Sequence, residues 1–305
     1  MAFPQAAVGV RAVTGGQVSR KGTSTVISDL NGKVALITGA GGRRGIGRAT
    51  ALRLAALGAD VALVDIAWPK ASRPADEQDD WDGVHSVAAE VEALGRKGLA
   101  LIADVTDEQQ VQNAVVATLQ LFGKIDLLVA NAAARPGPDR VNVVDLPETA
   151  LRHVLSVNVV GSFLCCKAVG KHMVGRKSGG NVVIVSSESG RVAKARLAAY
   201  CASKFALIGL MQAFALEMAE HGVRVNAVCP GVVDNARLDW TARTVAESSS
   251  ADSARAQIIS DASRATPLGR AATSEEVASV IAFLCSNASS HMTGQALGID
   301  GGSRM

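Results

Sequence analysis

The 305-residue chain is poor in aromatic residues and has no long run of like charge. Phe, Trp and Tyr together supply 3% of the residues, and no basic run is interleaved with them, so the pattern typical of nucleic-acid-binding surfaces is missing. The formal net charge of +3 is too small to indicate such a partner. No apolar stretch approaches the ~18 residues that span a bilayer, so no membrane partner is expected.

Cysteine is also scarce, and its spacing carries no metal or redox motif. No pair forms C-x-x-C, and no histidine cluster accompanies the thiols, most of which fall in apolar runs. We therefore expect reduced core cysteines, no metal site and a cytoplasmic location. The five are Cys165, Cys166, Cys201, Cys229 and Cys285.

Residues 1–28 contain no acidic residue, although they carry Arg11, Arg20 and Lys21. This composition predicts a flexible N-terminal extension. A start site further along the chain and a basic, acid-poor transit peptide are the alternatives.

From residue 33 onward, short apolar runs alternate with helical patterns. Runs that are apolar throughout suit strands of a parallel sheet covered on both faces. The alternation predicts a doubly wound Rossmann domain over residues 29–305, with about seven strands, helices on both faces and right-handed crossovers. The predicted strands are 34–38, 61–65, 99–103, 126–130, 181–186, 223–228 and 296–299. The predicted helices are 46–57, 84–94, 107–122, 148–174, 199–220 and 274–286.

Two segments interrupt this alternation. An inserted loop over residues 67–83 carries two prolines and an acidic patch. A polar segment over residues 235–266, rich in Ser, Ala and Arg, follows a predicted strand. Long connections at the carboxyl ends of such strands usually cover ligands, so we expect residues 235–266 to cover the substrate.

A glycine-rich turn joins the first predicted strand to its helix, in the run Thr38-Gly-Ala-Gly-Gly-Arg-Arg-Gly-Ile-Gly47. Glycines let the backbone approach a pyrophosphate, which the helix N-terminus attracts. The predicted contacts in this turn are Gly39, Gly41, Arg44, Gly45 and Ile46.

Polar residues end the next strands on the same edge of the predicted sheet. Asp65 can bond the ribose hydroxyls of adenosine, and a helix cap is its alternative role. Asp104, followed by Val105, can accept a bond from the adenine amino group. Asn131, followed by Ala132, either contacts the cofactor or ties strands together beneath it.

Tyr200 is the only tyrosine, and Lys204 follows it by one helical turn. Side chains four residues apart rise from the same helix face. An ammonium beside a phenol lowers its pKa, so the phenol can exchange a proton with an alcohol or a carbonyl oxygen.

Together these motifs resemble the short-chain dehydrogenase/reductase family in its compact single-domain form. The resemblance covers about residues 30–302. Its motifs follow the family's order: the glycine turn, Asp104-Val105, Asn131-Ala-Ala-Ala134, Asn158, Ser186-Ser187, Tyr200-x-x-x-Lys204, Pro230-Gly231 and the tail Gly294-Gln-Ala-Leu-Gly-Ile-Asp-Gly-Gly302.

The resemblance implies a catalytic role for four residues. Tyr200 would be the acid/base, and Lys204 would bond the nicotinamide ribose. Ser187 would bond the substrate oxygen, with Ser186 as the competing choice, and Asn158 would hold a relay water. Further cofactor contacts are implied at Pro230, Gly231 and Val233.

The sequence departs from the family pattern in its glycine turn, which has two extra residues between Gly39 and Gly45. Arg43 and Arg44 could meet the 2′-phosphate of NADP from this turn, whereas Asp65 would repel it. We therefore predict NAD, with NADP as the alternative.

The predicted reaction is hydride transfer between the nicotinamide cofactor and a secondary alcohol or ketone. The alternatives are a 3-oxoacyl thioester reductase using NADPH and a non-catalytic nucleotide sensor. Family members commonly pair through helices that match about 148–174 and 199–220, which implies a homo-oligomer, a tetramer or a dimer. Basic residues near Tyr200 and in the 235–266 segment raise the alternative of an anionic substrate.

Overall fold

A parallel sheet of seven strands organises the chain, in the order β3-β2-β1-β4-β5-β6-β7. The computed structural model describes residues 30–69, 74–246 and 250–304, and the extension expected over residues 1–28 lies outside them. The strands are β1 (Val34–Thr38), β2 (Asp60–Asp65), β3 (Gly98–Ile102), β4 (Leu127–Ala130), β5 (Gly180–Val185), β6 (Val223–Pro230) and β7 (Ala296–Ile299).

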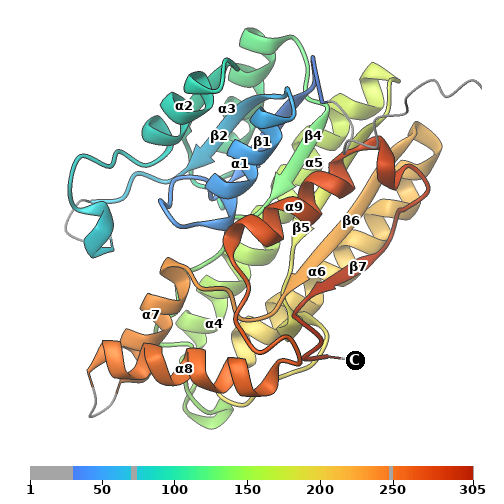
Figure 1. Cartoon of the computed structure of the whole chain (residues 1–305). Coiled ribbons are helices and arrows are strands. Elements are labelled where there is room, and N and C mark those ends of the chain that lie inside the picture. The colour runs from blue at the N-terminus through green and yellow to red at the C-terminus, as the bar shows by residue number, and fades with distance from the viewer. Residues whose placement is uncertain (1–29, 70–73, 247–249, 305) are drawn as a thin grey trace, which may run out of the picture.

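Helices cover both faces of this sheet, which confirms the predicted doubly wound architecture. Figure 1 shows α1 and α9 crossing the near face, with α5 and α6 behind the strands. The helices are α1 (Ile46–Ala56), α2 (Val84–Ala93), α3 (Glu108–Phe122), α4 (Glu148–Leu155), α5 (Gly161–Arg176), α6 (Ala198–Met218), α7 (Ala236–Val245), α8 (Ala251–Ala265) and α9 (Ser274–Cys285).

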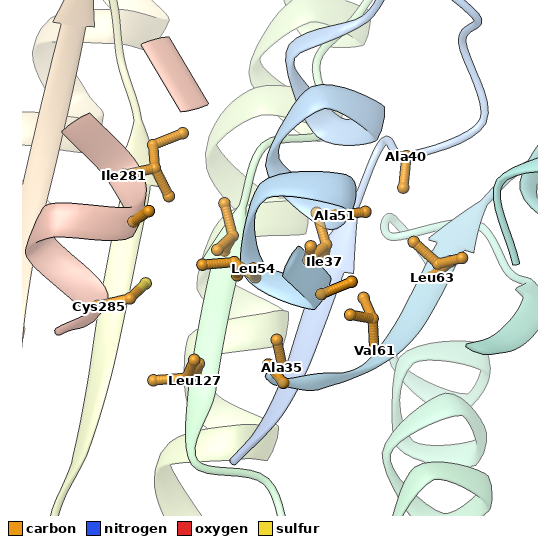
Figure 2. Packing of buried hydrophobic residues seen from close by; sticks show 14 of the residues in the cluster. Ala35, Ile37, Ala40, Ala51, Leu54, Val61, Leu63, Leu127, Ile281 and Cys285 are labelled. Atoms are coloured by element: carbon orange, nitrogen blue, oxygen red, sulfur yellow. The ribbon is translucent and has the colours of Figure 1, made fainter. Parts of the chain in front are cut away.

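The strands are apolar throughout because each side of the sheet carries its own core. Ala35 and Ile37 of β1 pack in the cluster beneath α1 and α9, whereas Leu36 between them packs beneath α3, α5 and α6. Figure 2 shows the first cluster, in which Leu54 of α1 and Ile281 of α9 point toward the strands. Consecutive strand residues point to opposite faces, so burial on both faces requires an unbroken apolar run.

The strand order has its switch point at β1. The chain adds β2 and β3 on one side of β1 and then β4 to β7 on the other, so that β1 pairs with both β2 and β4. In open sheets of this kind, ligands bind in the crevice beyond the carboxyl ends of the strands at such a point. The topology therefore places the glycine turn, which follows β1, beside the ends of β2 and β4.

The helix predicted over residues 148–174 has an interruption. A π-helical turn, Ser156–Val160, separates α4 from α5 without a break in the chain's helical path. Asn158 lies inside this turn and is fully buried. This turn is only five residues long, which is too short for its different period to be read from the hydrophobic pattern.

The polar segment predicted as a cover folds into α7 and α8, which lie at the lower end of the sheet in Figure 1. The side chain of Asn235 caps α7, and that of Ser250 caps α8. These capping residues were the available sequence signal for two helices in a segment that was predicted only as a covering connection.

The expectation that no segment is long and apolar enough for a membrane was wrong. Two helical stretches in the described ranges, Glu148–Arg176 and Ala198–His221, pass that test of length and hydropathy, with 50% and 39% of their most apolar windows buried. Their buried residues, such as Val169 and Met211, pack in the core against the sheet. Core packing accounts for the apolar character of these buried positions.

Candidate active site

A cleft of about 750 Å³ opens at the carboxyl ends of β1, β2, β4, β5 and β6. It brings together nearly all of the residues predicted to bind cofactor or substrate. The predicted residues that line it are Gly39, Gly41, Gly45, Ile46, Asp65, Asp104, Val105, Asn131, Ala132, Ser187, Tyr200, Lys204, Pro230, Gly231 and Val233. Asn158 and Arg44 are not among its lining residues.

The glycine turn forms one wall of this cleft. Gly39 has a φ of +66°, and a Cβ there would lie 2.8 Å from the Cα of Ala132. A Cβ on Gly47 would lie 2.3 Å from the carbonyl oxygen of Gly39. Gly47 therefore serves the close packing of α1 on the turn, while Gly39, Gly41 and Gly45 face the cleft.

The N-terminus of α1 belongs to this wall, because Gly45 and Ile46 line the cleft. Its N-cap residue is Gly45, which offers no side-chain cap. The first N–H groups of a helix have no intrahelical partner and favour an anion. A narrow glycine turn, an uncapped helix start and the nearby Asp65 carboxylate together fit the pyrophosphate and ribose of a dinucleotide.

Asp65 lies at the end of β2, where backbone amides hold its carboxylate. Gly41 N donates to Oδ2 and Ile66 N donates to Oδ1, both at 2.8 Å. Burial raises the pKa of Asp65, and these two hydrogen bonds act against the increase. The carboxylate thus connects the glycine turn to β2 at the mouth of the cleft.

Asn131 ties β4 to β1, as one of its two predicted roles required. Its Nδ2 donates to the carbonyl oxygens of Thr38 and Gly39, both at 2.9 Å. The Thr38 hydroxyl in turn accepts from the backbone N–H groups of Asn131 and Ala132, both at 3.1 Å. This network fixes the floor of the cleft beneath the glycine turn.

The 67–83 insertion holds both arginines of the glycine turn. Its Asp79 pairs with Arg43 at 2.7 Å, and its Asp76 pairs with Arg44 at 2.8 Å. Arg44 also pairs with Asp239 of α7. These carboxylates direct the Arg44 side chain away from the cleft. The acidic patch of the insertion therefore neutralises the two cations that could have met a 2′-phosphate.

Tyr200 and Ser187 meet in the cleft, Tyr200 from α6 and Ser187 from the end of β5. Both side chains line the cleft, and the polar interaction with the Ser187 side chain is one of the causes that lower the pKa of Tyr200. The competing Ser186 hydroxyl donates instead to the carbonyl oxygen of Lys204 at 2.9 Å, so it is engaged with the backbone of α6. Ser187 is therefore the serine that faces the phenol, whereas Ser186 has a structural role.

Lys204 lies beneath the Tyr200 ring, with its Nζ 5.6 Å from the ring centroid. Burial lowers the pKa of Lys204 to about 8. Burial also opposes ionisation of Tyr200, but Arg237, Lys204 and the Ser187 side chain outweigh it, so the pKa of the phenol is lowered.

Asn158 is buried next to this cluster, behind the wall of the cleft. Its Oδ1 accepts from Ala134 N at 2.8 Å, and its Nδ2 donates to the Ser203 hydroxyl at 2.8 Å. Its carbonyl oxygen accepts from the Ser162 hydroxyl at 2.7 Å. These contacts join the β4 loop to α6 immediately beside Lys204. The relay-water role implied for Asn158 stays a prediction.

Several cleft residues were not found by sequence reasoning. The guanidinium carbon of Arg135 lies 3.1 Å from the ring centroid of Trp68 and 4.1 Å from that of Trp240. Burial lowers the pKa of Arg135 to about 10. Arg140 lies over Tyr200, as does Arg237, which the sequence had indicated only as one of the basic residues of the 235–266 segment. The arginines follow the Asn131-Ala134 motif and open α7, but no sequence spacing links them to Tyr200.

The described ranges contain no group of three or more His, Cys, Asp or Glu side chains that could hold a metal ion. All five cysteines are free and buried, in agreement with the expected core thiols. Burial raises the pKa of Cys165 to about 12, so that thiol stays protonated at neutral pH.

Known proteins resemble this chain over most of its length. A family model described as enoyl-(acyl carrier protein) reductase matches residues 39–304. A short-chain dehydrogenase/reductase of Armillaria gallica is 37% identical over 279 residues, which cover 92% of this chain and 98% of that protein. Galactitol 2-dehydrogenase of Agrobacterium fabrum is 34% identical over 284 residues, covering 90% and 99%.

The fold agrees with a solved structure as well. Carveol dehydrogenase from Mycobacterium avium, determined in complex with NAD, superposes with a TM-score of 0.79 and 30% sequence identity, covering 90% of this chain and 99% of that one. Because the family model matches most of the chain and the Armillaria gallica relative is 37% identical over 92% of it, the protein belongs to the short-chain dehydrogenase/reductase family.

Proposed function

We propose that this oxidoreductase interconverts a secondary alcohol and a ketone with a nicotinamide dinucleotide. The observation that carries the proposal is the cluster of Ser187, Tyr200 and Lys204 in the same cleft as the glycine turn. The dinucleotide, when bound, accepts or donates the hydride. The alcohol-oxidising relatives, such as galactitol 2-dehydrogenase, support this reaction class.

In the direction of oxidation, Tyr200 takes the hydroxyl proton of the substrate. The lowered pKa of the phenol makes its basic form accessible closer to neutral pH than that of free tyrosine. Ser187 bonds the substrate oxygen and orients it toward Tyr200. In reduction the same phenol returns the proton to the developing alkoxide.

Lys204 supports this exchange in two ways. Its positive charge beneath the ring favours the phenolate, and its hydrogen bond to the Val185 carbonyl at 2.8 Å fixes the ammonium at the bottom of the cleft. When the dinucleotide is bound, the same ammonium can donate to the nicotinamide ribose. The role of Lys204 therefore includes both cofactor affinity and turnover.

The preferred cofactor in this proposal is NAD. The Asp65 carboxylate lines the cleft at the end of β2, and a 2′-phosphate beside it would bring like charges together. Arg43 and Arg44 are paired with Asp79 and Asp76, which weakens their ability to offset that repulsion.

A 3-oxoacyl thioester reductase stays the second candidate, because the matching family model is named for a different reaction on acyl thioesters, enoyl-(acyl carrier protein) reduction. Asp65 and the neutralised arginines disfavour the NADPH that this alternative implies. A non-catalytic nucleotide sensor is disfavoured because Ser187, Tyr200 and Lys204 are all present and meet in the cleft.

We also propose that the protein forms a homo-oligomer through α5 and α6. Phe163 on α5 is 45% exposed, and Leu216 on α6 is 81% exposed. Large apolar side chains at the surface favour burial against a second copy. The cytoplasmic location expected from the reduced thiols stays a prediction.

The test of the reaction class combines binding with turnover. NADH fluorescence is followed on mixing with the purified protein, and NAD⁺ reduction is then measured at 340 nm against secondary alcohols that include galactitol and carveol. Turnover of at least one alcohol is expected. NADH binding without turnover of any alcohol or ketone would support the sensor instead.

A further inference from the structure

Two guanidinium groups flank the phenol of Tyr200. The Cζ atoms of Arg140 and Arg237 each lie 4.9 Å from its ring centroid. Arg140 comes from the connection between β4 and α4, and Arg237 comes from the first turn of α7. Both side chains line the cleft. Two elements far apart in the sequence thus deliver a positive charge to the same ring.

These two cations are incompletely neutralised by the described part of the chain. Arg140 is buried and pairs only through Nε, 3.3 Å from the neighbouring Asp139 carboxylate. Arg237 forms no ion pair with a carboxylate in the described ranges. Burial lowers the pKa of Arg140, and repulsion from Arg237 lowers it further. Placing the guanidiniums together therefore costs free energy in the absence of an anion.

The other cations near the cleft have partners or lie elsewhere. Arg135, which also lines the cleft, stacks on Trp68 and Trp240 and is attracted by Glu77 and Asp65. Lys194 pairs with Glu188. Arg255 pairs with Asp234 and Asp239. Arg243, on the same helix as Arg237, is exposed and does not line the cleft. The unmatched positive charge is thus concentrated at Tyr200.

We propose that Arg140 and Arg237 bind a carboxylate of the substrate, so that the substrate is a short hydroxy acid or the corresponding oxo acid. Guanidinium groups match a carboxylate with paired, charge-assisted hydrogen bonds. Because both groups flank the ring that exchanges the proton, the carboxylate lies close to the reacting carbon. The inference rests on the proposed function, since it specifies the substrate class of the same site.

A single carboxylate suits the site better than a phosphate. Asp139 partly offsets Arg140, which leaves about one positive charge at Arg237 to be matched. The surrounding lining includes apolar side chains such as Val157, Leu197 and Ile258. A dianion would carry excess charge into these apolar surroundings, and burying unmatched charge is costly.

Matched acid and amide pairs test the proposal with the full-length protein and NAD⁺. The pairs are 3-hydroxybutyrate with 3-hydroxybutyramide and lactate with lactamide, which differ in charge at nearly equal size. For at least one pair, kcat/KM is expected to be about 10- to 100-fold higher for the acid, as charge-assisted hydrogen bonds imply. Arg237→Gln should remove most of this ratio, whereas Arg243→Gln should preserve it.

The ratio of kcat/KM between an acid and its amide distinguishes substrate binding by Arg237 from an effect of Arg237 on the pKa of Tyr200. If Arg237 only tuned the phenol, Arg237→Gln would slow the acid and the amide equally, and the proposal would be overturned. Arg140→Gln provides a second variant if its melting temperature shows that it is folded. Arg237 is only half-buried, so Arg237→Gln is expected to fold like the wild-type protein.

Binding decides the question even if none of these alcohols is oxidised. With NAD⁺ present, butyrate should raise the melting temperature more than butyramide, and Arg237→Gln should abolish the difference. Equal effects of butyrate and butyramide would overturn the proposal. If the two ligands raise the melting temperature equally but the wild-type protein oxidises neutral alcohols, only the carboxylate proposal fails. If the wild-type protein oxidises no alcohol and reduces no ketone, the proposed function itself is refuted.

Discussion

The Nζ atom of Lys204 donates a 2.8 Å hydrogen bond to the carbonyl oxygen of Val185, the last residue of β5. This bond fixes the ammonium of a helix residue to the end of a central strand. Burial lowers the pKa of Lys204 to about 8, so its protonation responds to pH close to neutrality. The sheet thereby positions the group that controls the charge of Tyr200.

The lowered pKa of Tyr200 predicts opposite pH profiles for the two reaction directions. Burial opposes ionisation, but Arg237 and Lys204 outweigh it, so the phenolate forms below the ordinary pKa of about 10. Oxidation needs the phenolate and should rise with pH, while reduction needs the phenol and should fall. The midpoints of kcat/KM against pH check this, and they belong to the coupled Tyr200–Lys204 pair.

Arg237→Gln provides the matched test of that profile. Removal of a positive charge near the phenol should move the oxidation midpoint to higher pH. Arg243→Gln, on the exposed part of the same helix, should leave it unchanged. A midpoint that does not move in Arg237→Gln would show that Arg237 does not stabilise the phenolate.

Asp65→Ala should shift cofactor preference toward NADP. The wild-type carboxylate and a 2′-phosphate about 4 Å apart would repel by roughly 1 to 4 kcal/mol, or about five- to several-hundred-fold in affinity. The measurement is kcat/KM for NAD⁺ and NADP⁺ in both proteins. Asp60→Ala, at the opposite end of β2, is the control and should leave the preference unchanged. A wild-type preference for NADP⁺ would contradict the assignment.

Gly47→Ala should destabilise the glycine turn and weaken NADH binding. Its Cβ would lie 2.3 Å from the Gly39 carbonyl oxygen, and overpacking of this kind typically costs about 1–3 kcal/mol. Gly137→Ala is the control, because an added Cβ on this loop glycine, which lies outside α5 and α6, meets no neighbouring atom within 4 Å. Thermal unfolding and NADH titration should separate the two variants. Wild-type behaviour of Gly47→Ala would refute the tight packing.

The proposed oligomer predicts a change in mass when charge is added to α5 or α6. Phe163→Glu and Leu216→Glu should each yield smaller assemblies by light scattering, because a carboxylate buried at an interface is costly. Val144→Glu is the control, since Val144 is 92% exposed and lies outside both helices. An unchanged mass in both test variants would place the contact elsewhere.

Sequence reasoning predicted the sheet well because local patterns encode it. Strands buried on both faces need unbroken apolar runs, as in β1, and glycines mark the turn that follows. The four predicted catalytic residues lie close together, although Asn158 is buried behind the cleft wall and does not line the cleft. Its π-helical turn gave no signal, because five residues are too few for a change of helical period to be read from the hydrophobic pattern.

The pairing of charges could not be predicted from spacing. Arg44 is held by Asp76 and by Asp239, which is 195 residues away along the chain. Arg140 and Arg237 converge on Tyr200 only through the tertiary fold. Such long-range partners depend on how loops and α7 pack over the sheet, which no short motif records.

Tyr200→Phe tests the central claim most directly, because it removes only the hydroxyl that exchanges the proton. Loss of a positioned acid/base typically costs about 10²–10⁴-fold in rate, so alcohol oxidation should fall by that factor. NADH affinity, measured on the same sample, should stay within about twofold of wild type, since the ring and Lys204 remain in place. Turnover within a few-fold of wild type would contradict the assignment of Tyr200 as the acid/base.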